Sequence, residues 1–552
     1  MSAVAPERAP VPATESSERT VTVSVETVAW AAVAAVFLAI RLWPIWQMPV
    51  GGAELAHLSG AWNASIGVED DRYVPTLFQA LTAVLLNFST SEVPARVLAF
   101  VATATLPLAL YLRRPLLGAG GALLALLVLA FDAVGMVVGV GASAMGFDLA
   151  IAAWLFVLFT RPAAPGWLWA VAAFGAATAG AIVLPLVAAL GATALLRNER
   201  PTISSLVWPA AGVTAGVILT SLRPGLGPDG LTIAPVAVFV DGFDQRWSTA
   251  DALGVFFFAS WPIVVGGVLA AAWRCYEAWR ENEIAREDTL LLTWMAFSLG
   301  WFVTALPSHD ATPLAGLAMP SALLLGRALA TGIPAARDAD WTYAKYLIPF
   351  AGVTFLIAAF YIGDWARLNE VGDTSDKLVV TGLMLATLAA LAVALLDRAS
   401  SPTVLTLLVP VAAIPLFIAT FTIAFRAGDA PLPSPLAPVQ ARELRDIALQ
   451  ATGENGGDVV VHPDFEDSLT WPFRDSGNVV VASQIPSEAG FVIWPAEAAA
   501  PQGFAPLEGQ WALVHEVQSP AGGFLRLLHW YADRYSLAIT PEPAAVYVKE
   551  RE

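Results

Sequence analysis

The residues that could do acid–base chemistry lie in a few short parts of the chain. Glu54 stands among apolar neighbours and is followed three residues later by His57. Asp148 opens an apolar stretch, and a separate short segment reads Ser308-His309-Asp310. A carboxylate in a partly buried pocket has its pKa raised toward neutrality, which suits it to accept a proton. Glu54 is therefore the first candidate for a general base.

Other charged residues allow simpler explanations. The run Glu69-Asp70-Asp71 fits a solvated loop. Arg41 and Asp132 fall inside apolar segments, where a charge is costly and usually functional. The long side chain of Arg41 could equally extend its charge to the membrane surface. The sequence leaves both explanations of Arg41 open.

Composition excludes several classes of protein. Hydrophobic residues make up 57% of the 552 residues and charged residues 14%, against roughly 25% charged residues in soluble domains. A net charge of −17 without a basic run argues against nucleic-acid partners. The single cysteine, Cys275, excludes an intrachain disulfide and a CxxC metal site. A structural or surface role, without metal-ligand spacing, fits His462, His515, His529, Trp471 and Trp530.

The apolar residues lie in uncharged blocks of 16 to 35 residues, whereas a spanning helix needs ~20 residues. The longest block, Pro162–Leu196, exceeds one helix, and Gly180 and Pro185 offer a break. We therefore expect an α-helical polytopic membrane protein with about thirteen transmembrane helices. The expected spans are 27–46, 93–112, 115–138, 147–160, 165–181, 183–196, 203–222, 252–273, 289–307, 311–330, 346–363, 378–396 and 402–425.

The distribution of basic residues orients these spans. An odd number of spans places the two termini on opposite sides of the membrane. With a cytoplasmic N-terminus, twelve Lys and Arg residues fall on the inner side and six on the outer side. Because basic residues concentrate in cytoplasmic loops, we expect a multi-pass plasma-membrane protein with its C-terminus outside the cytoplasm.

The segments outside the expected spans differ from them in amino-acid composition. Residues 1–26 are polar, lack the features of a signal peptide and predict a disordered cytoplasmic tail. The transmembrane domain is expected over 27–426, and its first outer loop, 47–92, holds an apolar segment, 76–88. That segment is too short to span and predicts a helix on the membrane surface. A Pro-rich linker, 427–438, follows the last span.

The last part of the chain, 439–552, predicts an extracytoplasmic α/β domain. A helix is expected over Val439–Thr452 and another near Phe524–Tyr535. Short strands are expected at Asp458–Val461, Asn478–Ala482, Phe491–Trp494, Trp511–Val517 and Ala544–Val548.

The order of features in the first 160 residues resembles a known family. An acidic residue, Glu54, follows the first span, and a Tyr-x-Pro-x-Leu segment, Tyr73–Leu77, comes next. The second span opens with Glu92–Arg96 and ends in Arg113-Arg114 before Gly118, and Gly141–Phe159 contains Asp148. This order is similar to the GT-C membrane glycosyltransferases, in the branch of the protein O-mannosyltransferases and the lipid A aminoarabinose transferases. Two C-terminal segments, Leu469–Val479 with its Trp-Pro-Phe-Arg-Asp sequence and Trp530–Tyr535, resemble the subgroup called flippase-activity-associated membrane proteins.

The resemblance implies a GT-C-like fold and transfer of a sugar from a polyprenyl-phosphate-linked donor. The acceptor, at the outer membrane face, would be a glycan, a lipid or a protein. Glu54 would be the general base, and Asp148 would help to position the phosphate or a metal. A divalent metal is compatible with this chemistry, although no residues identify a site for one. The residues implied in binding the donor phosphate or substrate are Arg72, Tyr73, Arg96, His309, Asp310 and His57.

Alternatives remain at this stage. A non-catalytic or flippase-associated scaffold is favoured by Ala53, which stands where a second acidic residue is common in the family. A transporter of lipid-linked sugars would place charges near mid-membrane and often contain an internal repeat, whereas the acidic residues here cluster at one face. Arg96, instead of binding a phosphate, could pair with Glu92 four residues earlier.

Overall fold

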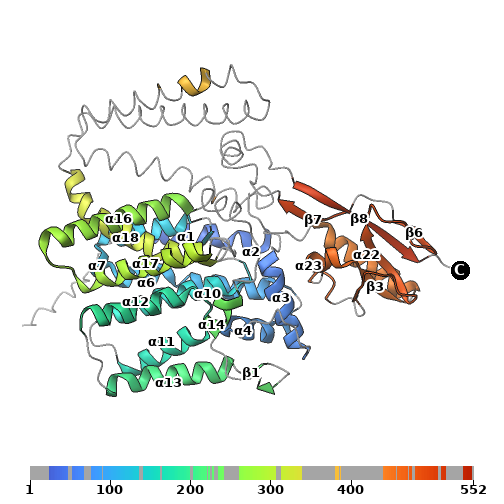
Figure 1. Cartoon of the computed structure of the whole chain (residues 1–552), viewed down its shortest axis with the longest axis horizontal. Coiled ribbons are helices and arrows are strands. Elements are labelled where there is room, and N and C mark those ends of the chain that lie inside the picture. Colours follow the sequence, from blue (N-terminus) through green and yellow to red (C-terminus); the bar gives the residue numbers. More distant parts are fainter. Residues whose placement is uncertain are drawn as a thin grey trace, which may run out of the picture.

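The computed structural model shows a bundle of helices with a small mixed sheet at one end (Figure 1). The structure describes residues 24–47, 52–67, 76–89, 91–132, 134–135, 141–161, 165–198, 203–220, 222–223, 227–228, 234–241, 260–305, 312–337, 379–383, 386, 420, 439–455, 457–469, 471–474, 479–507, 511–517 and 539–549. The bundle helices are α1 Val25–Leu42, α2 Pro44–Gln47, α3 Gly52–Ser65, α4 Leu77–Leu86, α5 Val93–Thr103, α6 Leu106–Leu112, α7 Arg114–Leu117, α8 Ala119–Ala130, α10 Ala144–Phe159, α11 Gly166–Thr178, α12 Val183–Leu196, α13 Ile203–Thr220, α14 Ala234–Asp241, α16 Trp261–Glu281, α17 Arg286–Ala305 and α18 Thr312–Arg337. A two-residue ladder, β1 Leu222–Arg223 with β2 Gly227–Pro228, follows α13.

Three helical segments within the described residues are long and apolar enough to cross a membrane: Val25–Trp46, Val93–Leu112 and Thr312–Ala330. The first begins where Ser24 caps α1, its hydroxyl accepting from the Thr27 N–H at 3.1 Å. The second bends between α5 and α6, where Pro107 lacks the N–H that a continuous helix needs. Among the expected spans, 346–363 lies wholly outside the described residues, and 378–396 and 402–425 lie almost wholly outside them.

The long apolar block breaks where its sequence predicted. Helix α11 ends at Thr178 and α12 begins at Val183, with Gly180 between them. Helix α16 covers the described part of the span expected at 252–273 and continues beyond its expected end, to Glu281. The charges that seemed to end it are neutralised locally: Arg274 pairs with Glu277 and with Asp288, each at 2.5 Å.

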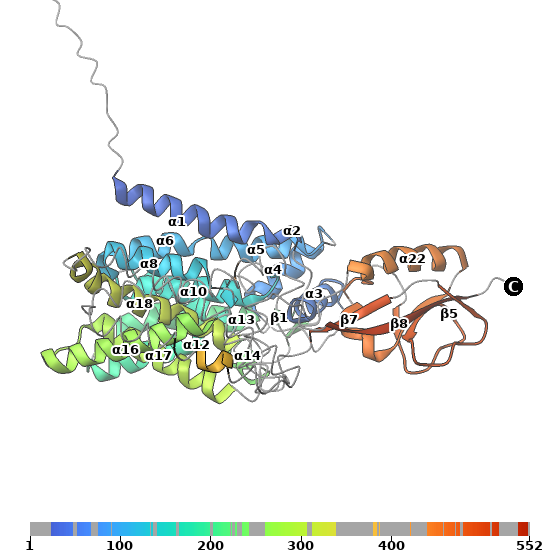
Figure 2. The ribbon, with the colours of Figure 1, turned by 90° about the horizontal axis from the view of Figure 1, so that it is seen from above.

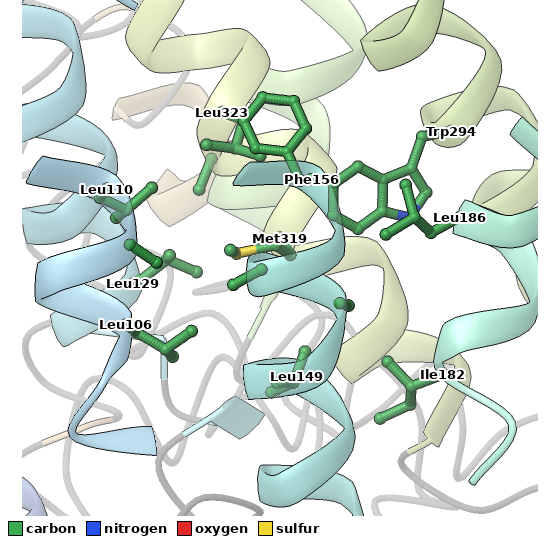
Figure 3. Packing of buried hydrophobic residues seen from close by; sticks show 14 of the residues in the cluster. Leu106, Leu110, Leu129, Leu149, Phe156, Ile182, Leu186, Trp294, Met319 and Leu323 are labelled. Atoms are coloured by element: carbon green, nitrogen blue, oxygen red, sulfur yellow. The ribbon is translucent and has the colours of Figure 1, made fainter. Parts of the chain in front are cut away.

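The bundle core is a large cluster of buried leucine, alanine and aromatic side chains from helices far apart in sequence. Phe156 of α10 and Trp294 of α17 face each other with ring centroids 6.1 Å apart, and Leu110, Leu129 and Leu323 pack nearby (Figure 3). Such packing, with no water to drive it, is the main stabilising interaction available between helices in a membrane.

Two glycines allow a close crossing of α8 and α18 in this core. Gly121 of α8 faces Gly326 of α18, and a Cβ atom on either would overlap the carbonyl oxygen of the other. The two backbones therefore approach as closely as small residues allow in membrane helix pairs.

One end of the bundle is rich in arginines that join neighbouring turns. Arg113 donates to the Thr160 carbonyl at 3.1 Å, and Arg327 donates to the Leu116 carbonyl and pairs with Asp288. Helix α7 and the turn between α16 and α17 lie at the end away from the C-terminal sheet (Figure 1). The basic residues of these separate turns thus share one end of the bundle.

The C-terminal domain contains a sheet packed against a helix. Its elements are α22 Val439–Asn455, β3 Asp458–Val461, η3 Pro463–Phe465, α23 Glu466–Leu469, β4 Val479–Val481, β5 Ala489–Pro495, β6 Phe504–Pro506, β7 Trp511–Val517 and β8 Ile539–Lys549. The strand order is β4-β3-β5-β8-β6, and β7 also pairs with β8. Strand β3 is parallel to β4 and β5, whereas β8 is antiparallel to its neighbours.

Alternation along the strands explains the two faces of this sheet. Val459 and Val461 join Leu444 and Ala448 of α22 in one core, while Val460 and Val492 face the other side. All five expected strands are present. Strand β6 was not expected, and the expected helix near Phe524–Tyr535 lies outside the described residues.

Candidate functional site

The candidate site is a buried ion pair between Glu54 and Arg96. Arg96 Nε donates to Glu54 Oε1 at 2.6 Å and Nη2 donates to Oε2 at 2.9 Å, a bidentate arrangement. The exposed fraction is 1% for the Arg96 side chain and 5% for Glu54. The backbone N–H of Ala142 also donates to Glu54 Oε1, at 2.8 Å. Both carboxylate oxygens therefore accept hydrogen bonds in a setting with little water.

Four separate segments hold this pair in place. Glu54 lies in the first turn of α3, where a negative charge is favourable at a helix N-terminus. Arg96 comes from α5, and its Nη1 donates to the Ile45 carbonyl of α2 at 3.0 Å. Ala142 belongs to the turn before α10. The ends of four segments thus meet at one pair of charges.

Arg96 makes its bidentate pair with Glu54, and Glu92 also lies near enough to act on the charge of the guanidinium. Glu92, buried and four residues before Arg96, contributes a second negative charge to the surroundings of the guanidinium. The bidentate partner is Glu54, 42 positions away in the sequence. Helical spacing alone could not reveal this long-range pairing.

His57 lies near the pair on the same helix, three residues after Glu54. Burial lowers the pKa of the His57 imidazole below its ordinary value, although a hydrogen bond with Gln79 and the Glu54 charge act in the opposite direction. The Gln79 side chain of α4 also donates to the His57 carbonyl at 3.4 Å. Lowering the pKa favours the neutral ring, which can both donate and accept a proton.

Asp148 lies on α10, away from the ion pair, and its carboxylate binds a backbone N–H. Its Oδ1 accepts from the Gly180 N–H at 2.7 Å, at the break between α11 and α12. A Cβ atom at position 180 would overlap the Asp148 carboxylate, so the break needs glycine there. The structure therefore gives Asp148 the task of fixing a helix break, which the sequence analysis did not foresee.

Arg41 and Asp132 line a small internal cavity of ≈ 10 Å³, room for about one water molecule. Arg41 does not extend to the surface: it is buried and donates to the Leu129 carbonyl at 2.7 Å and the Ala130 carbonyl at 3.4 Å. Asp132 accepts from the Gly135 N–H at 3.0 Å. These charges join α1 to the end of α8 inside the bundle.

Other residues named from the sequence lie outside the described part of the chain: Arg72, Tyr73, His309 and Asp310. Within the described residues, no group of three or more His, Cys, Asp or Glu side chains could hold a metal ion.

Trp471 of the C-terminal domain reaches the vicinity of the ion pair. Its side chain is 3% exposed and belongs to a cluster with Leu55 and Leu58 of α3, Ala95 of α5 and Ala142. A structural or surface role was expected for this tryptophan, and no signal within 439–552 could reveal a contact with residues hundreds of positions earlier.

Comparison with known proteins identifies the fold. No protein-family model matches the chain, and no curated protein matches it either. Among solved structures, ArnT from Cupriavidus metallidurans bound to undecaprenyl phosphate matches with a TM-score of 0.53 and 14% identity, over 94% of this chain and 97% of that chain. The chain has the fold of ArnT. The apo structure of the same protein matches at a TM-score of 0.48 and 16% identity, over 83% of this chain and 85% of that chain.

The ArnT likeness covers both parts of the molecule, since nearly the whole of each chain is aligned. The chain therefore shares the fold of ArnT, and it contains helices that are long and apolar enough to cross a membrane. At this level of identity the likeness concerns the fold, so the function has to be argued from the site.

Proposed function

We propose that this chain is a multi-pass membrane glycosyltransferase that moves a sugar from a polyprenyl-phosphate-linked donor to an acceptor at the outer face of the plasma membrane. The buried Glu54–Arg96 pair carries the proposal, within a fold shared with a protein whose crystal structure contains undecaprenyl phosphate. A guanidinium binds phosphate bidentately, and a carboxylate beside it can accept a proton. The pair therefore brings together the two groups that the transfer needs.

The two residues would work by exchanging partners. In the pair, Glu54 occupies the guanidinium edge that a phosphodiester would otherwise take. When the negatively charged donor phosphate binds Arg96, Glu54 loses its Arg96 bonds and keeps the bond from the Ala142 N–H to Oε1. Oε2 then becomes free to accept a proton, so donor binding would prepare the base.

The reaction is a substitution at the anomeric carbon of the sugar. The acceptor hydroxyl oxygen forms a bond to that carbon, and the bond between the carbon and the phosphate oxygen breaks. The hydroxyl proton passes to Glu54, and the electron pair of the broken bond leaves with the polyprenyl phosphate. Arg96 stabilises the charge that develops on the departing phosphate.

The remaining sequence candidates take supporting places in the proposal. His57, held near Glu54 by the turn of α3, would contact the acceptor or the sugar. Asp148 would act by holding the α11–α12 break, and through it the wall of the site. The family resemblance places the donor phosphate or substrate near Arg72, Tyr73, His309 and Asp310.

The arginine-rich end of the bundle supports the proposed orientation. Basic residues concentrate on the cytoplasmic side of membrane proteins, and Arg113, Arg274 and Arg327 lie at the end away from the C-terminal domain. The N-terminus would then be cytoplasmic, and the Glu54–Arg96 pair and the C-terminal domain would face outward.

A second function is favoured by one observation. Both oxygens of Glu54 are engaged, and Ala53 beside it offers no second carboxylate. A non-catalytic scaffold, or a protein that assists transport of lipid-linked sugars, would keep such a pair closed permanently as part of its core.

Glu54→Gln separates these functions, with Glu26→Gln in the first turn of α1, away from the site, as the control. Two quantities are measured on purified protein and on membranes: binding of undecaprenyl phosphate, and loss of labelled sugar from a polyprenyl-phosphate carrier. If the donor phosphate replaces Glu54 as the partner of Arg96, Glu54→Gln should bind undecaprenyl phosphate at least as tightly as the wild type. The neutral glutamine amide competes less strongly than the carboxylate for the Arg96 guanidinium. Transfer should fall by ~10²–10⁴-fold, the share usual for a general base.

Near-normal transfer by Glu54→Gln would remove Glu54 as the base. Weaker lipid binding by this variant would show that Glu54 only supports Arg96. No transfer by the wild type, with binding of the lipid retained, would favour the scaffold.

A further inference from the structure

The C-terminal domain contacts the candidate site through one aromatic residue. Trp471 opens a turn, Trp471–Arg474, that follows α23. Helix α23 packs against α3, and both views place α3 between the bundle and the sheet (Figures 1 and 2). The indole thus lies where the two parts of the molecule meet.

The surface that receives Trp471 is built mainly of small residues. The side chains that share its cluster are Leu55, Leu58, Ala61, Ala64, Ala83, Leu86, Ala95 and Ala142. Each of these residues is nine-tenths or more buried. We call this set the alanine socket. Its five alanines and three leucines are small or flexible beside the one large ring of the cluster, the Trp471 indole.

The two aromatic residues of the turn, Trp471 and Phe473, pack into different hydrophobic clusters. Phe473 is buried with Val459, Val461 and Phe491 in the core between the sheet and α22. Trp471, two residues earlier, is absent from both clusters of the sheet and belongs to the alanine socket. The domain therefore does not need Trp471 to build its own core.

The indole is held in a fixed orientation by its own turn. The guanidinium of Arg474 lies over the Trp471 ring, 3.8 Å from the centroid, and Arg474 Nη1 donates to the Trp471 carbonyl at 2.6 Å. Stacking of this kind attracts a cation to an indole face and limits the ring's movement. Trp471 is thus presented to the socket as a rigid group.

The socket includes residues adjacent in sequence to both members of the ion pair, and the residue whose N–H donates to Glu54. Leu55 follows Glu54, Ala95 precedes Arg96, and Ala142 supplies the N–H that donates to Glu54 Oε1. A ring packed among these three residues restrains the backbone segments from which the charged groups project. Movement of the indole would shift the backbone of residues adjacent to Glu54 and Arg96, and with it the carboxylate and the guanidinium.

We propose that Trp471 is a positioning residue, through which the C-terminal domain fixes the geometry of the Glu54–Arg96 pair. The role in transfer rests on the function proposed above, whereas the docking of the domain does not. The active site is then shared between the membrane bundle and the C-terminal domain, and the bundle alone is incomplete.

The test compares Trp471→Ala and Trp471→Phe with Trp494→Ala in the full-length protein. Trp494 is a matched control, because it belongs to the same domain but packs on His462 and not in the socket. Hydrogen exchange should quicken in α3 for Trp471→Ala, while β3 and β5 keep wild-type protection. Transfer kcat should fall by about 10- to 100-fold, the loss expected from small misplacement of reacting groups, with a smaller change in donor KM. Trp471→Phe should restore most of both properties, and Trp494→Ala should match the wild type.

Unchanged exchange in α3 of Trp471→Ala would overturn the docking role, whether or not the wild type transfers sugar. Faster exchange in α3 with unaltered transfer would overturn the positioning role. If the wild type is inactive, undecaprenyl phosphate binding replaces transfer as the readout: weaker binding by Trp471→Ala supports positioning, and equal binding contradicts it.

Discussion

At the scale of single residues, the Glu54–Arg96 pair combines a large electrostatic attraction with a large cost of removing both charges from water. Such a pair contributes little net stability compared with apolar residues of the same shape, whereas removing one partner leaves a buried charge without compensation. A protein that retains this arrangement has a use for the charges themselves. The hydrogen bonds from Ala142 and to Ile45 fix where they point.

A double-mutant cycle with Arg96→Met and Glu54→Leu measures this balance. Each single substitution should lower the free energy of unfolding in detergent by about 3–5 kcal/mol, because the other charge stays buried. The double variant, with apolar side chains at both positions, should lie close to the wild type and so lose far less than the sum of the two single losses. Thermal and chemical unfolding of the four proteins provides the comparison. Strict additivity would mean that the two side chains do not interact in solution.

At the scale of elements, close approach of helices depends on residues without a side chain. The crossing of α8 and α18 has Gly121 against Gly326. Sequence periodicity marks both helices as apolar but does not show which glycines face a partner.

Gly326→Ala should therefore be destabilising, although alanine is normally the better helix former. The new methyl group overlaps the Gly121 carbonyl, and overpacking of this kind costs about 1–3 kcal/mol. Gly300→Ala of α17 is the matched control, because a Cβ there meets nothing within 4 Å. The control should leave stability equal or higher in the same thermal unfolding experiment. A Gly326→Ala variant as stable as the control would show that the two helices can separate freely.

Local patterns predicted the elements well where a single segment determines its own structure. The strands Asp458–Val461 and Trp511–Val517 and the helix at Val183–Leu196 have the expected bounds. Helix α16 continues beyond the expected span, because the charge of Arg274 is offset by Glu277 and Asp288. Strand β6 was missed because Phe504–Pro506 is three residues long and depends on its pairing with β8.

The candidate site was predictable only in part. Glu54 was predicted because it is an acidic residue among apolar neighbours, and Arg96 was predicted from the order of the motifs. Their mutual pairing, the Ala142 N–H and the Trp471 contact join positions tens to hundreds of residues apart. No local periodicity encodes such contacts. Asp148 was a candidate for the same reason as Glu54, yet its partner is a backbone N–H at a helix break.

At the scale of the whole molecule, the two ends of the bundle differ in chemistry. One end holds the Glu54–Arg96 pair and the docked C-terminal domain, and the other gathers arginines from several turns. Arg197 belongs to the second group, since it donates to the Ile284 carbonyl in the turn between α16 and α17. The asymmetry is the charge distribution that the positive-inside rule associates with a fixed orientation.

Reporter fusions test this orientation. Alkaline phosphatase fused after Arg442, in α22, should be active, because the enzyme needs an oxidising compartment for its disulfides. The same reporter fused after Asn198, at the arginine-rich end, should be inactive, and a green fluorescent protein there should fluoresce. A chain truncated at either point keeps all basic turns that precede it, so insertion of the earlier spans is unaffected. Phosphatase activity after Asn198 together with inactivity after Arg442 would show that the orientation is the reverse of the one proposed. The proposed site would then face the cytoplasm. Activity at both points would instead indicate an even number of spans between them, in place of the seven expected.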